Sequence, residues 1–569
     1  MRLLVALALI GLFVLPFGRH DSWAAGPVVS EDFMASTANP LATKAARDMI
    51  VAGGSAVDAA IAAQMVLGLV EPQSSGIGGG AFLLFYDADE RTVTSFDGRE
   101  TAPLAATPAL FLEPDGEPMS WTTASEGGLP VGTPGVVKML EMVHARHGKL
   151  PWADLFEPAI GLAENGFTMS PRLHEVLDWV EEPERFPTFF NFYFDHNGER
   201  KPVGTRLVNP DYAATLRQIA EGGADAFYEG PIAESIVAMV EGASVNPGLL
   251  ALDDFAAYQA KERPPVCAPY RVWKICGMGP PSSGGITVLQ ILLLLENHEI
   301  QSVEPASLEA VHMVSEASRL AYADRNLYIG DNDFVAVPIA GLLDKDYLAE
   351  RATLIDPGSS MGEAEAGTPP DSDHSFLAPD PDASVGYSTS HVSIVDRDGN
   401  AVSMTTSIEQ AFGSRLMVDG FMLNNELTDF SFVPEIDGQL VANRVEPGKR
   451  PRSSMAPMIV LDQEGRLVMA VGTVGGSRII AYVAKTVIAN LDWGLDIQAA
   501  IELPHHVNRN GTTELEDGTS LADLQDDLED MGHDVSLRVH TTGLHGFHIV
   551  DGVIYGGADP RREGTALGQ

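Results

Sequence analysis

Thr389 stands where a polar stretch of the chain gives way to a segment of alternating apolar and polar residues. A hydroxyl group is a weak nucleophile unless a base lies beside it. A threonine that becomes N-terminal carries its own base, because its freed α-amino group has a pKa near ~8. Thr389 is therefore a candidate nucleophile if the bond after Ser388 is cut, although a threonine at such a junction is otherwise a structural residue.

The elements around Thr389 follow from composition and periodicity. Pro, Asp, Ser and Gly crowd together over residues 356–386, which predicts a solvated linker. Alternation over 390–396 and 401–407, joined by a turn at 397–400, predicts a β-hairpin. A cut at this junction would leave a new chain end anchored on a strand.

The rest of the chain predicts helices and antiparallel strands in layers. Apolar residues at helical spacing over 40–70, interrupted at Gly53-Gly54, predict two packed helices, and 307–328 predicts a long one. Strands packed against helices of this kind predict an α+β layered domain. The remaining predicted strand pairs are 81–86 with 92–96, 458–461 with 467–472, and a hairpin near 546–555, with helices at 478–490 and 521–531.

Composition excludes several classes of protein. The chain has 569 residues, 45% of them hydrophobic, which is enough for a large packed core. Lys and Arg number 36 against 79 Asp and Glu, giving a net charge of -43. Phosphate backbones and anionic lipid surfaces would repel such a chain, so no nucleic-acid partner is expected.

The N-terminus is typical of an exported protein. Arg2 is followed by an apolar run over 3–17 and then by Ser22-Trp23-Ala24, a pattern suited to signal peptidase near Ala24 or Ala25. An uncleaved anchor is the alternative. No later segment has the ~20 apolar residues of a membrane span. We therefore expect a signal peptide at 1–25, no span in the mature protein, and a periplasmic or secreted location.

The chain has two cysteines, Cys267 and Cys276, placed symmetrically about a predicted turn at 270–273. An oxidising compartment would let them pair across a hairpin. Two buried free thiols are the alternative.

Three short motifs do not predict chemistry. Residues 76–81 match G-x-G-x-x-A, but no strand precedes them and a strand follows. Residues 358–362 match G-x-S-x-G but lie in the predicted linker. His505-His506 has no partner at metal-ligand spacing, so neither a metal nor a cofactor is implied.

Eight blocks of the chain resemble those of γ-glutamyltransferases and run in that family's order from about residue 28 to 563. The block that begins at Thr389 looks like the start of the family's small subunit. The blocks are 71–80, 97–103, 280–285, 389–403, 423–426, 451–455, 475–478 and 557–561.

The resemblance implies an N-terminal-nucleophile hydrolase fold, a four-layer αββα sandwich of the α+β class. It also implies self-processing, in which the Thr389 hydroxyl attacks the carbonyl of Ser388. The expected products are a large subunit, 26–388, and a small catalytic subunit, 389–569, which stay associated. The expected substrate is a γ-glutamyl amide such as glutathione.

The resemblance also assigns the substrate-binding residues. Arg99 would hold the α-carboxylate, because a guanidinium offers paired donors, and Ser453 and Ser454 would add hydroxyls to it. Glu426 and Asp429 would hold the α-ammonium group. Without the flanking matches, Arg99 would be interpreted as part of a surface ion pair and the two serines as turn caps. The two acids would be interpreted as part of a solvated face.

The remaining roles concern the reaction itself. The backbone amides of Gly475 and Gly476 match the family's oxyanion hole, although Gly-Gly after a strand is otherwise a turn. Thr405 and Ser407 fall where the family places hydroxyls that support the nucleophile. Glu409 is a departure, since the family usually has Asn beside the ammonium-binding pair, and it would add a third carboxylate.

A second departure leaves the substrate open. The lid segment, 430–443, is shorter than in well-lidded members and lacks their tyrosine. Relatives on this scaffold cleave other amides, such as glutaryl cephalosporins or poly-γ-glutamate. Arg99 together with Glu426 and Asp429 favours a substrate that carries both carboxylate and ammonium. A catalytically dead periplasmic binding protein is the third reading, disfavoured because Thr389 and the Gly475-Gly476 pair are present.

Overall fold

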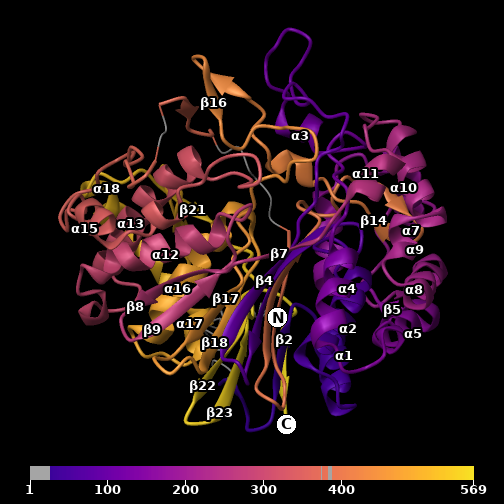
Figure 1. Ribbon diagram of the computed structural model, residues 1–569, viewed down its shortest axis with the longest axis horizontal. Coiled ribbons are helices and arrows are strands. Elements are labelled where there is room, and N and C mark those ends of the chain that lie inside the picture. The colour runs from indigo at the N-terminus through magenta and orange to yellow at the C-terminus, as the bar shows by residue number, and fades with distance from the viewer. Residues whose placement is uncertain (1–25, 373–374, 382–387) are drawn as a thin grey trace, which may run out of the picture.

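A computed structural model describes residues 26–372, 375–381 and 388–569 (Figure 1). The predicted signal peptide, 1–25, lies outside these residues, as do the six residues before Ser388. No helix in the described part of the chain is long and apolar enough to cross a membrane.

Two seven-stranded sheets form the centre of the molecule, and neighbouring strands within each are antiparallel. The first contains the strand after Thr389, in the order β24 (Thr565–Gly568), β2 (Met34–Thr37), β11 (Ser390–Val395), β12 (Ala401–Ser407), β3 (Gly80–Asp87), β4 (Thr92–Gly98) and β7 (Lys261–Arg263). The second has the order β1 (Val28–Ser30), β23 (Val553–Ala558), β22 (His545–Val550), β18 (Leu467–Gly472), β17 (Met458–Leu461), β9 (Trp273–Gly277) and β8 (Val266–Tyr270).

Helices cover the outer face of each sheet, and the sheets pack on one another through β11 and β12 against β18. On the first sheet lie α1 (Pro40–Val51), α2 (Ala56–Val70) and α4 (Val136–His147). On the second lie α12 (Gly284–Glu296), α16 (Ile479–Leu491) and α17 (Ile497–Glu502), with α13 (Leu308–Tyr328) packed on α12. Figure 1 shows these helical groups on opposite sides of the sheets. The predicted four-layer αββα sandwich is confirmed.

The inner helix α2 shows why this sequence forms the layer. All of its side chains are buried, as expected for a helix that is apolar on every face. Ser55 caps its start and forms a capping box with Asp58, so that two backbone N–H groups find acceptors. The break predicted at Gly53-Gly54 separates α1 from α2, and Gly53 has a φ of 96°, which suits glycine.

The hairpin β11–β12 follows the predicted alternation. Its turn is held by Asp396, whose carboxylate accepts hydrogen bonds from the backbone N–H of Asp398 and Asn400 at 3.0 Å each. Gly399 has a φ of 84°, a conformation that glycine adopts without strain. In this register His391 lies opposite Thr405, so both side chains point to the second sheet's side together with that of Thr389.

The prediction of a solvated linker holds for most of the described residues between 356 and 381, which are exposed or half-buried, but parts of this segment bind the rest of the protein. Ser360 Oγ donates to Glu316 Oε1 at 2.8 Å, and the N–H of Met361 donates to Glu316 Oε2 at 2.7 Å. Asp380 is 4% exposed and pairs with Arg452 at 2.9 Å. A polar segment can be buried in this way when its charges and N–H groups have partners.

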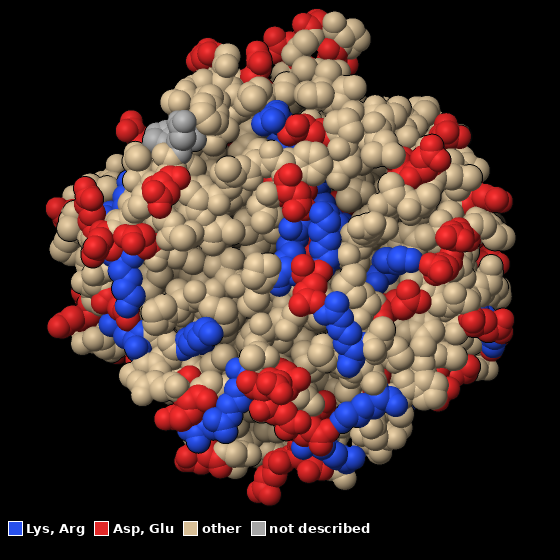
Figure 2. Space-filling view, viewed as in Figure 1, with Lys and Arg blue, Asp and Glu red and all other residues tan. Residues whose placement is uncertain are grey.

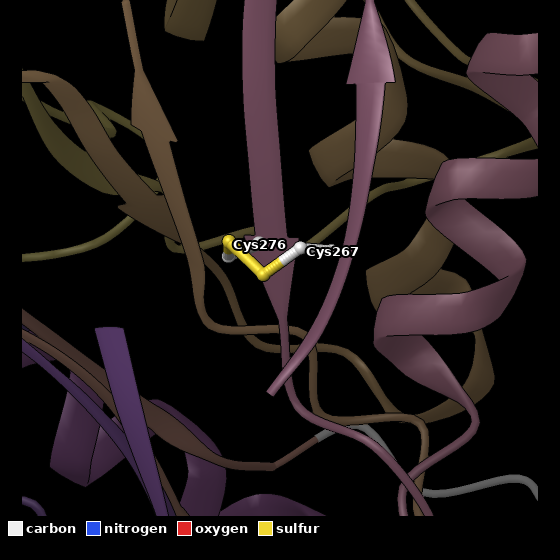
Figure 3. The surroundings of a disulfide bond; sticks show 2 residues. All are labelled: Cys267 and Cys276. Carbon is white, nitrogen blue, oxygen red and sulfur yellow. A yellow bond between two sulfur atoms is a disulfide. The ribbon is translucent and has the colours of Figure 1, made fainter. Parts of the chain in front are cut away.

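The cysteines form a disulfide across β8 and β9 (Figure 3). Cys267 and Cys276 are directly opposite in the hairpin, with their Cα atoms 4.1 Å apart. Of the two alternatives that the sequence left open, the cysteines are paired and are not free thiols.

The first and last described strands lie together. β1 pairs with β23 and β2 pairs with β24, so both ends enter the central sheets. Ser30 Oγ donates to the backbone oxygen of Gln569 at 2.6 Å and accepts from its N–H at 3.0 Å. In both sheets, strands from before and after Thr389 are neighbours.

Candidate active site

Thr389 directly precedes β11 at the inner side of the sheet, and only 3% of its surface is exposed. Its hydroxyl donates a hydrogen bond to the carbonyl oxygen of Ser388. Ser407 Oγ, from β12, lies 3.2 Å from Thr389 Oγ1 and 3.5 Å from the same carbonyl oxygen. The hydroxyl thus lies against the peptide group that self-cleavage would break, with a second hydroxyl beside both.

Thr405 has a different partner from the one predicted. Its hydroxyl is hydrogen-bonded to His391 Nδ1 at 2.9 Å, and His391 Nε2 is hydrogen-bonded to Ser393 Oγ at 2.9 Å. Burial, with a smaller effect of His545, holds the pKa of His391 well below its ordinary value. Thr405 therefore orients a neutral histidine, and of the two predicted hydroxyls it is Ser407 that contacts Thr389. Strand alternation is the sequence signal for His391, because it places residues 389, 391 and 393 on the same face.

Gly475 and Gly476 form a tight turn between β18 and α16. Their φ angles are 129° and 60°, in the left-handed region that favours glycine. A Cβ on Gly475 would lie 3.0 Å from the ring of Tyr482. Gly476 borders the same cavity as Thr389, whereas Gly475 borders a neighbouring one.

Arg99 is fully buried at the end of β4 and is bound to the two acids that were predicted to hold the ammonium. Its Nη1 donates to Glu426, and its Nη2 donates to Asp429 Oδ2 at 2.5 Å. Nε donates to the carbonyl oxygen of Pro451 at 3.1 Å. Burial would lower the pKa of Arg99, but these carboxylates outweigh it and raise the pKa.

The acids rather than Arg99 border the cavity. Glu426, Asp429 and Glu409 all line it, with Arg99 behind them. Burial raises the pKa of Glu426 to about 7, despite the opposing effect of Arg99. The cavity of the uncut chain therefore has an acidic wall.

Glu409 is buried, with 5% of its surface exposed. Its Oε2 accepts a hydrogen bond from Asn425 Nδ2 at 2.7 Å. Burial, followed by Asp429 and Glu426, raises the pKa of its carboxyl group well above the ordinary value. The three carboxylates predicted from the sequence thus line one cavity, and Glu409 does not face solvent.

Ser453 and Ser454 also line this cavity. Ser453 Oγ accepts from the N–H of Met455 at 3.1 Å. Ser454 Oγ accepts from Arg325 Nη2 at 2.9 Å, and Arg325 Nε donates to Ser283 Oγ at 2.9 Å. Arg325, on α13 and 2% exposed, was missed from the sequence, where an arginine in a helical run has no distinguishing signal.

One group of possible metal ligands occurs among the described residues. His312, Glu316 and His533 are buried with ligand atoms within 4.8 Å of one another. Each already has hydrogen bonds, including His312 Nδ1 to His533 Nε2 at 2.8 Å, and Arg319 donates to Glu316 at 2.9 Å. A guanidinium beside the acid opposes a cation there. Sequence spacing could not reveal this cluster, because His533 comes from a distant part of the chain.

The molecular surface agrees with the acidic composition. Figure 2 shows Asp and Glu around the edges of one face, with Lys and Arg in smaller groups between them.

Comparison with known proteins identifies a family that this chain matches. The model of the family described as "Gamma-glutamyltranspeptidase" matches residues 42–569. The chain is 36% identical over 551 residues to a glutathione hydrolase proenzyme of Bacillus subtilis (strain 168), covering 95% of this chain and 92% of that one. It is 34% identical over 546 residues to an acylase ACY 1 proenzyme of Pseudomonas sp. (strain SE83), covering 94% and 93%. Its fold matches the crystal structure of a cephalosporin acylase from Bacillus halodurans with a TM-score of 0.82, 25% identity, and 99% coverage of each chain.

Proposed function

Because the chain belongs to the gamma-glutamyltranspeptidase family, we propose that it is a self-processing enzyme that cleaves γ-glutamyl amides. The observation that carries the proposal is the contact between the Thr389 hydroxyl and the Ser388 carbonyl, beside a cavity lined by acids and by Gly476. The proenzyme names of the relatives support a chain that is cut to become active. We also propose export, since the leader-like segment precedes a chain that contains a disulfide.

Self-cleavage would break the peptide bond between Ser388 and Thr389 and leave Thr389 with a free α-amino group. Thr389 Oγ1 attacks the carbonyl carbon of Ser388, the C–N bond to Thr389 breaks, and the nitrogen gains the hydroxyl proton. Water then hydrolyses the resulting ester. Ser407 is positioned to donate to the oxygen of the tetrahedral intermediate, since its Oγ already lies 3.5 Å from that carbonyl oxygen. The products are residues 26–388 and 389–569, which share both sheets and so stay associated.

The same hydroxyl would then attack the γ-carbonyl of the substrate. The free α-amino group of Thr389 accepts the hydroxyl proton and delivers it to the departing amine, leaving a γ-glutamyl ester on Thr389. The Gly475-Gly476 turn would hold the oxyanion. Water or a second amine then attacks the ester carbon and restores the hydroxyl, which gives hydrolysis or transfer.

Donor selection would rest on both charges of the glutamyl group. The acidic wall suits an α-ammonium group, and Ser453, Ser454 and the Arg99 guanidinium suit the α-carboxylate. A substrate carboxylate would compete with Glu426 and Asp429 for Arg99, while its ammonium group would bind the acids so released. Binding both groups together exchanges one set of ion pairs for another, which favours a zwitterionic donor over a plain glutaryl group.

An acylase that accepts glutaryl amides is the second candidate. It is favoured by the acylase relatives and by the internal pairing of Arg99 with both acids, since no lysine or arginine is among the described residues that line the cavity. The two candidates differ in whether the substrate needs an amino group.

We expect the purified, processed protein to hydrolyse γ-glutamyl-p-nitroanilide at least ~10-fold faster, in kcat/KM, than glutaryl-p-nitroanilide, since a charged pair is worth about 1.5–3 kcal/mol. Release of p-nitroaniline is followed by absorbance for both compounds. A preference for the glutaryl compound would replace the leading proposal by the acylase.

Glu409→Asn is expected to flatten the pH dependence of KM for γ-glutamyl-p-nitroanilide between pH 5 and 8. Because its pKa is raised, Glu409 binds a proton more readily than an ordinary glutamate, and the ammonium group of the substrate would displace that proton. Substrate affinity should therefore weaken as the pH falls. Asn removes this proton while keeping a polar group beside Asn425.

A matched control is Glu464→Asn, an exposed acid in the turn after β17, which should keep the wild-type curve. Superimposable curves for the wild-type protein and Glu409→Asn would contradict a three-carboxylate donor pocket.

A further inference from the structure

Arg562 reaches the nucleophile from the turn between β23 and β24. Its Nη1 donates to the carbonyl oxygen of Thr389 at 3.4 Å. Nε and Nη2 donate to the carbonyl oxygen of Thr541 at 3.1 and 2.9 Å. A Cβ on Gly543 would lie 3.0 Å from Arg562 Cδ, so the missing side chain at Gly543 leaves room for the arginine. The guanidinium is thus held beside Thr389, and neither self-cleavage nor ester formation has given it a role.

The turn that carries Arg562 is fixed by Asp559. This buried carboxylate accepts from the Thr542 hydroxyl at 2.5 Å, and the backbone N–H of Arg562 donates to the Asp559 carbonyl oxygen at 3.3 Å. The neighbouring guanidinium of Arg561 lies elsewhere, bound to Glu516 at 2.5 and 2.9 Å and to Asp559 at 3.2 Å. Of the two adjacent arginines, only Arg562 is therefore directed at the nucleophile.

The contact between Arg562 and Thr389 does not depend on the bond that self-cleavage breaks. The carbonyl group of Thr389 belongs to its peptide bond with Ser390, which stays intact, and Ser390 is paired with Thr406 in the β11–β12 ladder. Within one residue the nitrogen and the carbonyl oxygen are at most about 3.7 Å apart. The freed α-amino group would therefore lie within about 7 Å of the guanidinium.

Arg562 is charged wherever the amino group titrates. Burial and then Arg172 lower the pKa of Arg562 to about 10, against the opposing effects of Glu71 and Asp559. Burial raises the pKa of Glu71, at the end of α2, to about 7 despite the effect of Arg562. As the pH falls below 7 this carboxyl group takes up a proton while the guanidinium remains positive. A nearby cation disfavours the protonated form of an amine.

The other ionisable groups near β11 contribute little positive charge. Burial lowers the pKa of His391 well below its ordinary value and that of His545, on β22, to about 4, so both rings are neutral near pH 7. On the side of α16, Arg478 is bound to Glu514 by two bonds of 2.6 and 2.8 Å, and burial raises the pKa of Tyr482. The strands β2, β12 and β18, which pack against β11, contain no ionisable side chain.

The acids near Thr389 lie across the cavity. On α2, Asp58 is in the first turn, at the opposite end of the helix from the strand end at Thr389. Glu409, Glu426 and Asp429 form the acidic wall, where the last two are bound to Arg99. In the proposed complex these acids bind the ammonium group of the donor. A measurement with the donor bound therefore reports mainly on the cation beside the α-amino group.

We propose that Arg562 is a positioning residue of the processed enzyme, whose guanidinium keeps the freed α-amino group of Thr389 neutral at a lower pH than an ordinary α-amino group. The inference rests on the proposed function and adds to it a residue that sets the working pH range. Only the neutral amine can accept the proton of the Thr389 hydroxyl. Loss of the guanidinium charge would raise the pKa of this amine, so activity would be lost at a higher pH.

The test is the pH dependence of kcat for γ-glutamyl-p-nitroanilide, measured with the processed enzyme from pH 5 to 9. We expect Arg562→Gln to move the midpoint of the acid limb upward by about one pH unit, which lowers kcat about tenfold near pH 5.5 and leaves it unchanged near pH 9. Self-cleavage should continue, because the nitrogen of the uncut chain is an amide and not a base. Arg562→Lys keeps the charge and should keep the wild-type midpoint.

Arg466→Gln is the matched control, an exposed arginine in the β17–β18 turn that should keep the wild-type curve. Superimposable curves for the wild-type protein and Arg562→Gln would overturn the inference, as would an equal loss of kcat at every pH or a folded variant that remains uncut. The wild-type curve is a test without any variant, since a midpoint at or above the ordinary value of ~8 would also overturn it. If the wild-type protein is uncut or does not cleave this donor, the proposed function itself fails.

Discussion

Thr389→Ala is expected to remain one uncut chain without activity on γ-glutamyl amides. The substitution removes the hydroxyl that lies against the Ser388 carbonyl, so neither self-cleavage nor ester formation has a nucleophile. The wild-type protein should separate on a denaturing gel into two chains, the smaller beginning Thr389-Ser390-His391. N-terminal sequencing of that chain identifies the bond that is cut.

Ser390→Ala is the matched control, because it removes the next hydroxyl along the chain. Ser390 Oγ accepts from Ser75 Oγ at 3.1 Å rather than lying on the Ser388 carbonyl, so this variant should still be cut. A wild-type protein without a chain that starts at Thr389, or a Thr389→Ala protein that is cut there, would contradict the assigned nucleophile.

Arg99→Lys is expected to lower kcat/KM for γ-glutamyl-p-nitroanilide by about 2–3 kcal/mol, or roughly 30- to 150-fold, while self-cleavage continues. Lysine keeps the positive charge between Glu426 and Asp429 but cannot hold both acids and the Pro451 carbonyl in one plane. The loss should be mainly in KM. Gel analysis of the same preparation reports the cleavage.

Arg319→Lys controls for the loss of any buried guanidinium. Arg319 is 2% exposed and is also paired with a glutamate, Glu316, but it lies outside the Thr389 cavity. Its variant should stay within a few-fold of wild-type kcat/KM. Wild-type kinetics in Arg99→Lys would remove this guanidinium from substrate binding.

Local patterns predicted the elements near the site well. The strands β17 and β18 have the predicted bounds, and α13 begins after the Ser307 cap. Alternation and turn residues specify such hairpins within a short window of sequence. The hairpin of β8 and β9 forms around the predicted turn at 270–273, whereas the short strand β7 was not predicted and the pairing of β2 with β24 joins opposite ends of the chain. Neither of these last two features has a signal in the local sequence, because tertiary packing decides whether it forms.

Within the site, residue identities were predictable and their contacts were not. The resemblance named Arg99, Glu426 and Asp429, but it assigned them to opposite charges of the substrate, whereas in this structure they bind one another. Strand alternation places Thr405 and Ser407 on one face, yet His391 takes the first hydroxyl and Thr389 the second. Such choices depend on distances between side chains that periodicity does not contain.

Because Ser30 contacts Gln569, the order in which the segments are connected could be changed without changing the active site. A gene rearranged to begin at Thr389, to pass from Gln569 through a short linker into residue 28, and to end at Ser388 would preserve both sheets. Circular permutation of this kind is tolerated where the joined ends lie close together at the surface. Once the initiator methionine is removed, the threonine amino group would be free from the moment of synthesis, so catalysis would no longer depend on a prior self-cleavage.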